Sequence, residues 1–212
     1  RKSGADQNDG AYTRGVRVLP TTHRHTLYSP SAWGGNRSEG KCEEAIAMDE
    51  SNATNTTLSL LAGGWQSYSE HLGAALAPLT AEQLDLRPAP GLRSIGELAR
   101  HIIGVRAGWF HDALEVGDAD FAGFQAWDGP DAATQPASEL VRGLAETWRV
   151  VHDAVIRFTP EELAQTITRE RRGRVHTLVR GWIVWHVIEH DLHHGGEIAY
   201  TLGMHGLQAP DI

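Results

Sequence analysis

The chain has little of what secreted, membrane-spanning or nucleic-acid-binding proteins require. Its 212 residues include a single cysteine, Cys42, which excludes a disulfide framework and a metal cluster held by thiolates. No run of about 18 apolar residues occurs, so no membrane span is expected, and residues 1–10 lack the apolar stretch of a signal peptide. The formal net charge of −8 argues against a nucleic-acid partner, because phosphate binding needs clustered lysine and arginine. We therefore expect a cytoplasmic protein.

The first 47 residues differ in composition from the rest of the chain. They mix Gly, Ser, Thr, Asn and Arg and show neither a helical nor a strand period. This composition predicts a disordered tail or a non-native extension, with Met48 as the natural start of a single domain over residues 48–212. The alternative is an ordered arm packed on that domain, which the apolar residues of the segment allow: Leu27, Tyr28 and Trp33.

Apolar residues recur at intervals of three and four in four later stretches, which is typical of amphipathic helices. The expected helices cover about residues 56–79, 95–115, 138–155 and 177–202. Capping-box patterns mark two helix starts, at Thr80 and at Ser94. Residues 117–136 are expected to form a long connection and residues 168–175 an exposed loop. With no convincing strand period, the pattern predicts an all-α four-helix bundle.

Histidine is the unusual component of the composition. The chain holds 12 histidines, and four of them fall within nine residues: His186, His190, His193 and His194. At about 100° per residue, His186 and His194 lie about 40° to either side of His190, on a stripe that also carries apolar residues. His190 and His194 stand one helical turn apart, so both can reach one divalent metal ion.

Two ligands rarely hold a metal, so a third histidine is expected from another helix. His101 is the best candidate, because it lies on the apolar stripe of the second predicted helix. Gly104 and Gly108 follow it on the same stripe, although glycine within a helix costs roughly 1 kcal/mol relative to alanine. They indicate either space for a ligand or the close approach of another segment. A hydrogen-bonded core histidine remains the alternative, and His186 is interpreted as a supporting or packed residue more readily than as a fourth ligand.

Three stretches resemble the DinB-like family of metal-binding four-helix bundles, which includes the YfiT-like thiol transferases. They are Arg87–His101, Thr159–Leu163 and His190–Glu197, and the resemblance covers about residues 54–207. The last stretch is similar to the family's His-x3-His-Arg-Gly-Gln run, with the histidine spacing kept. It departs from that run at Gly195, where the family usually has Arg, and at Glu197, where it usually has Gln.

The resemblance implies a site of three histidines, His101, His190 and His194, that binds zinc or nickel with water in the open positions. Characterised relatives of this family use low-molecular-weight thiols such as bacillithiol or mycothiol, while many others have no assigned reaction. We therefore expect transfer of a small thiol to an electrophilic small molecule. Metal-dependent hydrolysis and a non-catalytic metal- or ligand-binding module are the alternatives.

The chemistry expected at such a site needs a group that orients a ligand or carries a proton. Glu197 and Glu97 are the predicted catalytic residues, and Asp112 is a third carboxylate considered for this role. Any thiol must come from outside the domain, because residues 48–212 contain no cysteine. The expected partner is a small molecule, and a homodimer formed through helix faces is possible although the sequence does not indicate which face.

Overall fold

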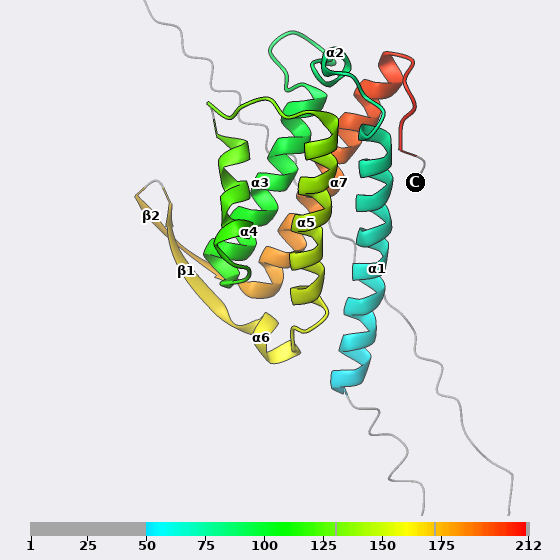
Figure 1. The fold of residues 1–212 in the computed structure, drawn as a ribbon. Coiled ribbons are helices and arrows are strands. Elements are labelled where there is room, and N and C mark those ends of the chain that lie inside the picture. Colours follow the sequence, from blue (N-terminus) through cyan, green and yellow to red (C-terminus); the bar gives the residue numbers. More distant parts are fainter. Residues whose placement is uncertain (1–49, 130, 172, 211–212) are drawn as a thin grey trace, which may run out of the picture. The chain divides into compact units, whose positions relative to one another are not determined.

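Four long helices form a bundle in the computed structural model: α1 (Glu50–Leu76), α3 (Ile95–Leu114), α5 (Ala137–Val155) and α7 (Arg180–Met204) (Figure 1). The structure describes residues 50–129, 131–171 and 173–210. The predictions for residues 1–47 and for Met48 lie outside the described residues. Helix α3 contacts both α7 and α5, and α1 packs chiefly against α5. The predicted all-α bundle is confirmed.

The core of the bundle is made by the apolar stripes that the sequence pattern indicated. All four long helices contribute side chains that are almost completely buried, and removing this surface from water is the main stabilising contribution. No helix in the described part of the chain combines the length and the apolar character that a membrane crossing requires. Representative core residues are Leu72, Leu76, Ile95, Ile102, Phe110, Leu140, Leu144, Ile183 and Ile198.

Side-chain caps fix the starts of several helices. The Ser94 hydroxyl accepts a hydrogen bond from the Glu97 backbone N–H at 3.2 Å, and the Glu97 carboxylate accepts one from the Ser94 N–H at 2.7 Å. Thr80 begins α2 (Ala81–Leu84) with the same capping box, and Thr159 begins α6 (Pro160–Ala164). These pairs satisfy N–H groups that the first helical turn leaves unpaired. Helix α3, which carries His101, therefore begins where the sequence predicted.

The connection before α5 contains helical turns that the sequence did not predict. Residues 117–136 include α4 (Ala119–Gly123) and the 3-10 helix η1 (Phe124–Asp128). Helix α5, expected from about residue 138, begins at Ala137 after the extended Pro136 and has no side-chain cap. The connection lies against α3, and this contact places Asp128 beside His101.

Residues 166–179 form an antiparallel hairpin rather than the expected loop and helix start. Strand β1 (Thr166–Arg171) pairs with β2 (Arg174–Val179), with Ile167 opposite Leu178 and Arg169 opposite His176. Only one side of the hairpin is partly buried, through the Ile167–Leu178 pair and Arg169, whose guanidinium lies 5.0 Å over the Trp109 ring. A single apolar pair among charged residues gives too weak an alternation for a strand to be predicted. Helix α7 therefore begins at Arg180 rather than near Thr177.

Candidate metal centre

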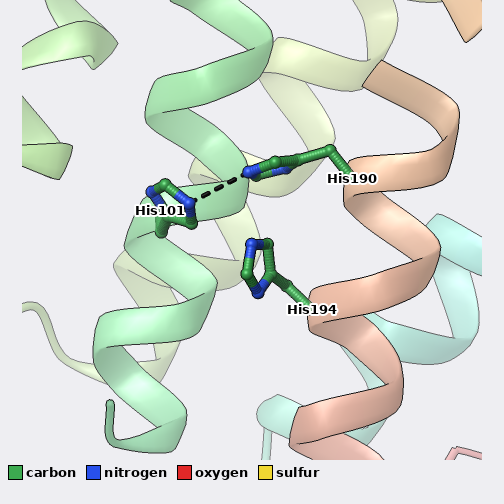
Figure 2. Close-up of side chains that lie close together, drawn as sticks. All are labelled: His101, His190 and His194. Carbon is green, nitrogen blue, oxygen red and sulfur yellow. Dashed lines mark hydrogen bonds between the residues drawn. The ribbon is translucent and has the colours of Figure 1, made fainter. Parts of the chain in front are cut away.

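Three histidine side chains from two helices converge between α3 and α7 (Figure 2). His101 comes from α3, and His190 and His194 come from adjacent turns of α7. One ring nitrogen from each lies within 4.8 Å of the other two, and the His101 and His190 Nε2 atoms are 2.9 Å apart. Their ring centroids are separated by 4.4 to 4.7 Å. The structure therefore brings together the three histidines predicted from the sequence.

The donor set fits a divalent metal ion. Two imidazole nitrogens that each lie about 2.1 Å from one ion stand roughly 3.0–3.4 Å apart, depending on the coordination angle. The 2.9 Å between His101 Nε2 and His190 Nε2 is close to this spacing. The other ring nitrogen of His190, Nδ1, is buried and has no hydrogen-bond partner among the described residues. Nε2 is thus the atom that His190 presents to the cluster.

Two carboxylates hold the outer nitrogens of the other two rings. Asp128 Oδ1 lies 2.6 Å from His101 Nδ1, and Glu197 Oε2 lies 2.6 Å from His194 Nδ1. A carboxylate on Nδ1 favours the tautomer with its proton there, which leaves the Nε2 lone pair free and fixes the ring orientation. Glu197 was a predicted site residue, whereas Asp128 was missed because it lies 27 positions from His101 in the sequence.

Gly104 explains how Asp128 comes so close to α3. A Cβ atom at position 104 would lie 2.7 Å from the Asp128 Cβ and 3.2 Å from its backbone nitrogen. Only glycine accommodates η1 at this distance. Of the two alternatives given for the glycines beside His101, Gly104 therefore serves the close approach of another segment. At Gly108 a Cβ would meet no atom within 4 Å.

Two histidines of the cluster, His190 and His194, are held in their neutral form. Burial above all, and then the positive charge of His194, His101, His186 and Arg93, lowers the pKa of His190 to about 2. Burial also lowers the pKa of His194, although its hydrogen bond with Glu197 opposes this shift. A neutral imidazole keeps the lone pair that a metal ligand needs. The surroundings of the cluster therefore favour metal binding over protonation.

The other residues considered for the site, Glu97, Asp112 and His186, have their main contacts with residues outside the three-histidine cluster. Glu97 forms an ion pair with Arg87 at 2.6 Å, and this contact lowers its pKa to about 2. Asp112 contacts His111 and Gln125. His186 packs between aromatic rings: it stacks on Trp182 at 4.9 Å and meets the edge of Trp109, and its ring lies 6.3 Å from that of His190. Its interpretation as a packed residue agrees with these contacts.

The histidine stripe lies at the edge of the buried face of α7 rather than at its centre. His190 and His194 are half-buried, whereas the centre of the bundle holds Asp191 and Arg106, whose side chains are both 0% exposed. Asp191 accepts hydrogen bonds from Arg106 Nε at 2.8 Å and from Trp65 Nε1 at 2.7 Å. The sequence offered a signal for this pair, since Asp191 falls in line with buried residues of α7: Val184, Val187 and Ile198.

Packing explains why position 195, where the resembling family usually has Arg, is a glycine in this chain. A Cβ at this position would overlap the Tyr68 hydroxyl oxygen. That hydroxyl lies 3.3 Å from the Leu192 carbonyl oxygen and donates a hydrogen bond to it. A side chain at position 195 would therefore separate α1 from α7 next to His194.

Two pockets lie near the cluster. One of about 260 Å³ lies beside Gly104 and Gly108 and is closed by Trp109, Asp128 and other residues. The other, of about 440 Å³, includes His194 and Glu197 in its wall. His194 is therefore accessible to small molecules from the pocket that it lines, and the pocket beside Gly104 reaches Asp128, the carboxylate that contacts His101.

Three histidines that converge between two helices of a bundle form the donor set of a candidate metal site, and sequence comparison identifies the family. The sequence model of the DinB superfamily matches residues 65–198. This span covers more than half of the chain and includes all three histidines. The chain therefore belongs to the DinB superfamily.

Solved structures show the same fold. A DinB-like protein from Bacillus cereus is similar with a TM-score of 0.55 and 20% sequence identity, over 71% of this chain and 93% of that one. A conserved protein from Enterococcus faecalis is similar with a TM-score of 0.50 and 18% identity, over 73% of this chain and 96% of that one. No curated protein matches the sequence. At these identities the likeness concerns the fold alone.

Proposed function

We propose that this protein is a metal-dependent enzyme that transfers a low-molecular-weight thiol to an electrophilic small molecule. One observation carries the proposal: three histidine ring nitrogens converge beside a pocket that His194 lines, and carboxylates fix two of the rings. His101, His190 and His194 would hold the ion. Zinc or nickel suits three imidazole donors. When bound, such an ion lowers the pKa of a thiol or water and so supplies a nucleophile at neutral pH.

The carboxylates of the site would orient the histidines and move protons. Asp128 and Glu197 hold His101 and His194 by their Nδ1 atoms. The second oxygen of Glu197, Oε1, lies 3.6 Å from exposed His193 and is accessible to solvent. Glu197 can therefore accept the thiol proton as the sulfur–carbon bond forms, and return a proton to the group that leaves the carbon. Of the two predicted catalytic residues, Glu197 has the contact with the cluster and Glu97 is engaged by Arg87.

The arrangement of the pockets favours a transfer over the two alternatives. A transferase must hold two substrates close to one centre, and two pockets lie nearby: His194 lines one, and Asp128, which contacts His101, lines the other. A hydrolase needs only one such place in addition to water. A non-catalytic metal site would be expected to have a fourth protein ligand, and among the described residues the group contains three.

Metal analysis of the purified protein tests the first part of the proposal. The wild-type chain is expected to hold about one zinc or nickel ion and to gain thermal stability on adding it, because the ion binds the folded state. His190→Ala should lose both effects. His71→Ala, which alters an exposed histidine of α1, serves as the control and should retain them. A wild-type chain without bound metal or a metal-induced thermal shift would overturn the proposed site.

Thiol consumption tests the reaction. The metal-loaded chain is mixed with 1-chloro-2,4-dinitrobenzene and with cysteine, glutathione or 2-mercaptoethanol, and product formation is followed by absorbance. We expect turnover with at least one thiol, its loss on adding chelator, and its recovery on adding zinc or nickel. Thiol-independent release of chloride would favour the hydrolase, and no chelator-sensitive turnover would contradict the proposed transfer.

A further inference from the structure

The pocket beside His194 is walled largely by apolar side chains. Its volume is about 440 Å³, and Leu92, Leu98 and Tyr200 form much of its surface. Tyr200 is 67% exposed and Leu92 is 53% exposed, although large apolar side chains are usually buried. His194 and Glu197 lie at one side of the same pocket. A molecule in this pocket would therefore place one end at the histidine cluster and an apolar part against Leu92 and Tyr200.

Arg93 provides the positive charge at this pocket. It lies just before α3 and also borders a neighbouring pocket with Arg87 and Arg100. Arg87 is paired with Glu97 at 2.6 Å, and Arg100 donates hydrogen bonds to the carbonyl oxygens of Trp127 and Ala132. Arg93 has no hydrogen bond or ion pair with any residue that the structure describes. It is the arginine of this group whose guanidinium is free to bind a ligand.

We propose that this pocket binds a substrate with a carboxylate, which Arg93 holds, and an apolar portion, which rests on Leu92 and Tyr200. The proposal rests on the proposed function, since it assigns one of its two substrates to this pocket. A guanidinium binds a carboxylate through two parallel hydrogen bonds. A carboxylate suits the pocket better than a phosphate, because the carboxylate of Glu197, which also lines the pocket, would repel a dianion more strongly.

Calorimetric titration of the zinc-loaded full chain with 4-phenylbutyrate and with its neutral amide tests the assignment. We expect the carboxylate to bind roughly three- to tenfold more tightly than the amide, the range for a charged contact that solvent partly screens. Arg93→Gln should remove this preference and leave amide binding unchanged. Arg149→Gln, an exposed arginine on α5, is the matched control and should keep the preference.

A carboxylate would also bind a metal ion directly, so the titration is repeated on the chain without metal. The preference for the carboxylate should persist there, because Arg93 does not need the ion. Equal binding of the two probes, a preference that survives Arg93→Gln, or tighter binding of phenyl phosphate than of 4-phenylbutyrate would overturn the proposal. Failure of the proposed function would show separately, as missing metal or missing thiol transfer, and would not alter this readout.

Discussion

At the scale of single residues, metal binding at the candidate centre depends on which ring nitrogens carry a proton as much as on the distances between the rings. His101 and His194 each have a carboxylate on Nδ1, at 2.6 Å in both cases. Such a partner settles the tautomer and raises the electron density at the opposite nitrogen. His190 lacks a partner on Nδ1 among the described residues, so its orientation depends on packing and on the contact of its Nε2 with His101. The three rings are therefore not equally constrained.

Removing the carboxylate of Asp128 should weaken metal binding without abolishing it. Asp128→Asn is expected to lower the affinity for zinc by about 10- to 100-fold, the usual effect of losing such a supporting contact. Competition with a chromophoric chelator measures the change. Asp131→Asn, an exposed aspartate of the same connection, is the control and should bind zinc like the wild type. An unchanged affinity in Asp128→Asn would show that His101 does not need this support.

Glu97 should influence stability near neutral pH rather than metal binding. Its pKa is lowered to about 2, chiefly by the hydrogen bond from Arg87, so its contribution is present above about pH 4.5 and is lost as the pH falls toward 2. We expect Glu97→Gln to lower the free energy of unfolding at pH 7 by less than about 1 kcal/mol, because the ion pair is exposed. The difference from the wild type should shrink as the pH falls.

Urea denaturation of both chains between pH 7 and pH 3 checks this expectation. Metal affinity measured at pH 7 should be the same in the two proteins. A large loss of metal binding in Glu97→Gln would instead connect Glu97 to the histidine cluster.

At the scale of elements, the short helix η1 completes the site that the long helices α3 and α7 begin. It brings Asp128 to His101 and forms part of the pocket beside Gly108. The β1–β2 hairpin closes the same pocket through Arg169, whose guanidinium covers the Trp109 ring. The segments that connect the long helices, η1 and the hairpin, therefore form part of the surface around the candidate centre.

Alanine at the two glycines of α3 should have opposite effects on stability. At Gly104 a Cβ would collide with Asp128, whereas at Gly108 it would meet open space. Gly108→Ala should stabilise the protein by about 0.5–1 kcal/mol, since alanine favours the helix. Gly104→Ala should destabilise it and also weaken zinc binding, because η1 must move away from His101. Urea unfolding and chelator competition measure both effects, and equal stabilisation by the two substitutions would contradict the close approach.

At the scale of the whole molecule, a buried ion pair connects all four long helices at the level of the histidines. Arg106 on α3 contacts Asp191 on α7, the Leu144 carbonyl oxygen on α5 at 3.1 Å, and the Ser69 hydroxyl on α1 at 3.2 Å. Asp191 directly follows His190 in the sequence. The pair therefore fixes the position of α7 along α3, on which the meeting of His190 with His101 depends.

Breaking this pair should cost much more than breaking an exposed one. Arg106→Leu leaves the buried carboxyl group of Asp191 without its guanidinium partner, and we expect a loss of about 3–5 kcal/mol in the free energy of unfolding. Adding Asp191→Leu to the same chain should recover part of that loss. Arg149→Ala, which breaks the exposed pair with Asp153 at 3.9 Å, should change stability by less than about 1 kcal/mol. A small loss in Arg106→Leu would mean that water or rearrangement compensates for the missing guanidinium.

The sequence by itself determined the four helices and the adjacency of His190 and His194. Both follow from the helical period, which acts over a few residues. The period also placed His101 on an apolar stripe, but it does not give the distance between two helices. The hairpin was not predicted because its single apolar pair, Ile167 and Leu178, gives almost no alternating signal.

Only the tertiary structure decided which groups surround the histidines. His101 and His190 are 89 positions apart, Arg106 and Asp191 are 85 apart, and His101 and Asp128 are 27 apart. Contacts over such separations depend on how the helices and their connections pack, and no local pattern encodes that packing. For this reason Glu197, one turn from His194, was predicted as a site residue from the sequence, whereas Asp128, which has the same contact with His101, was not.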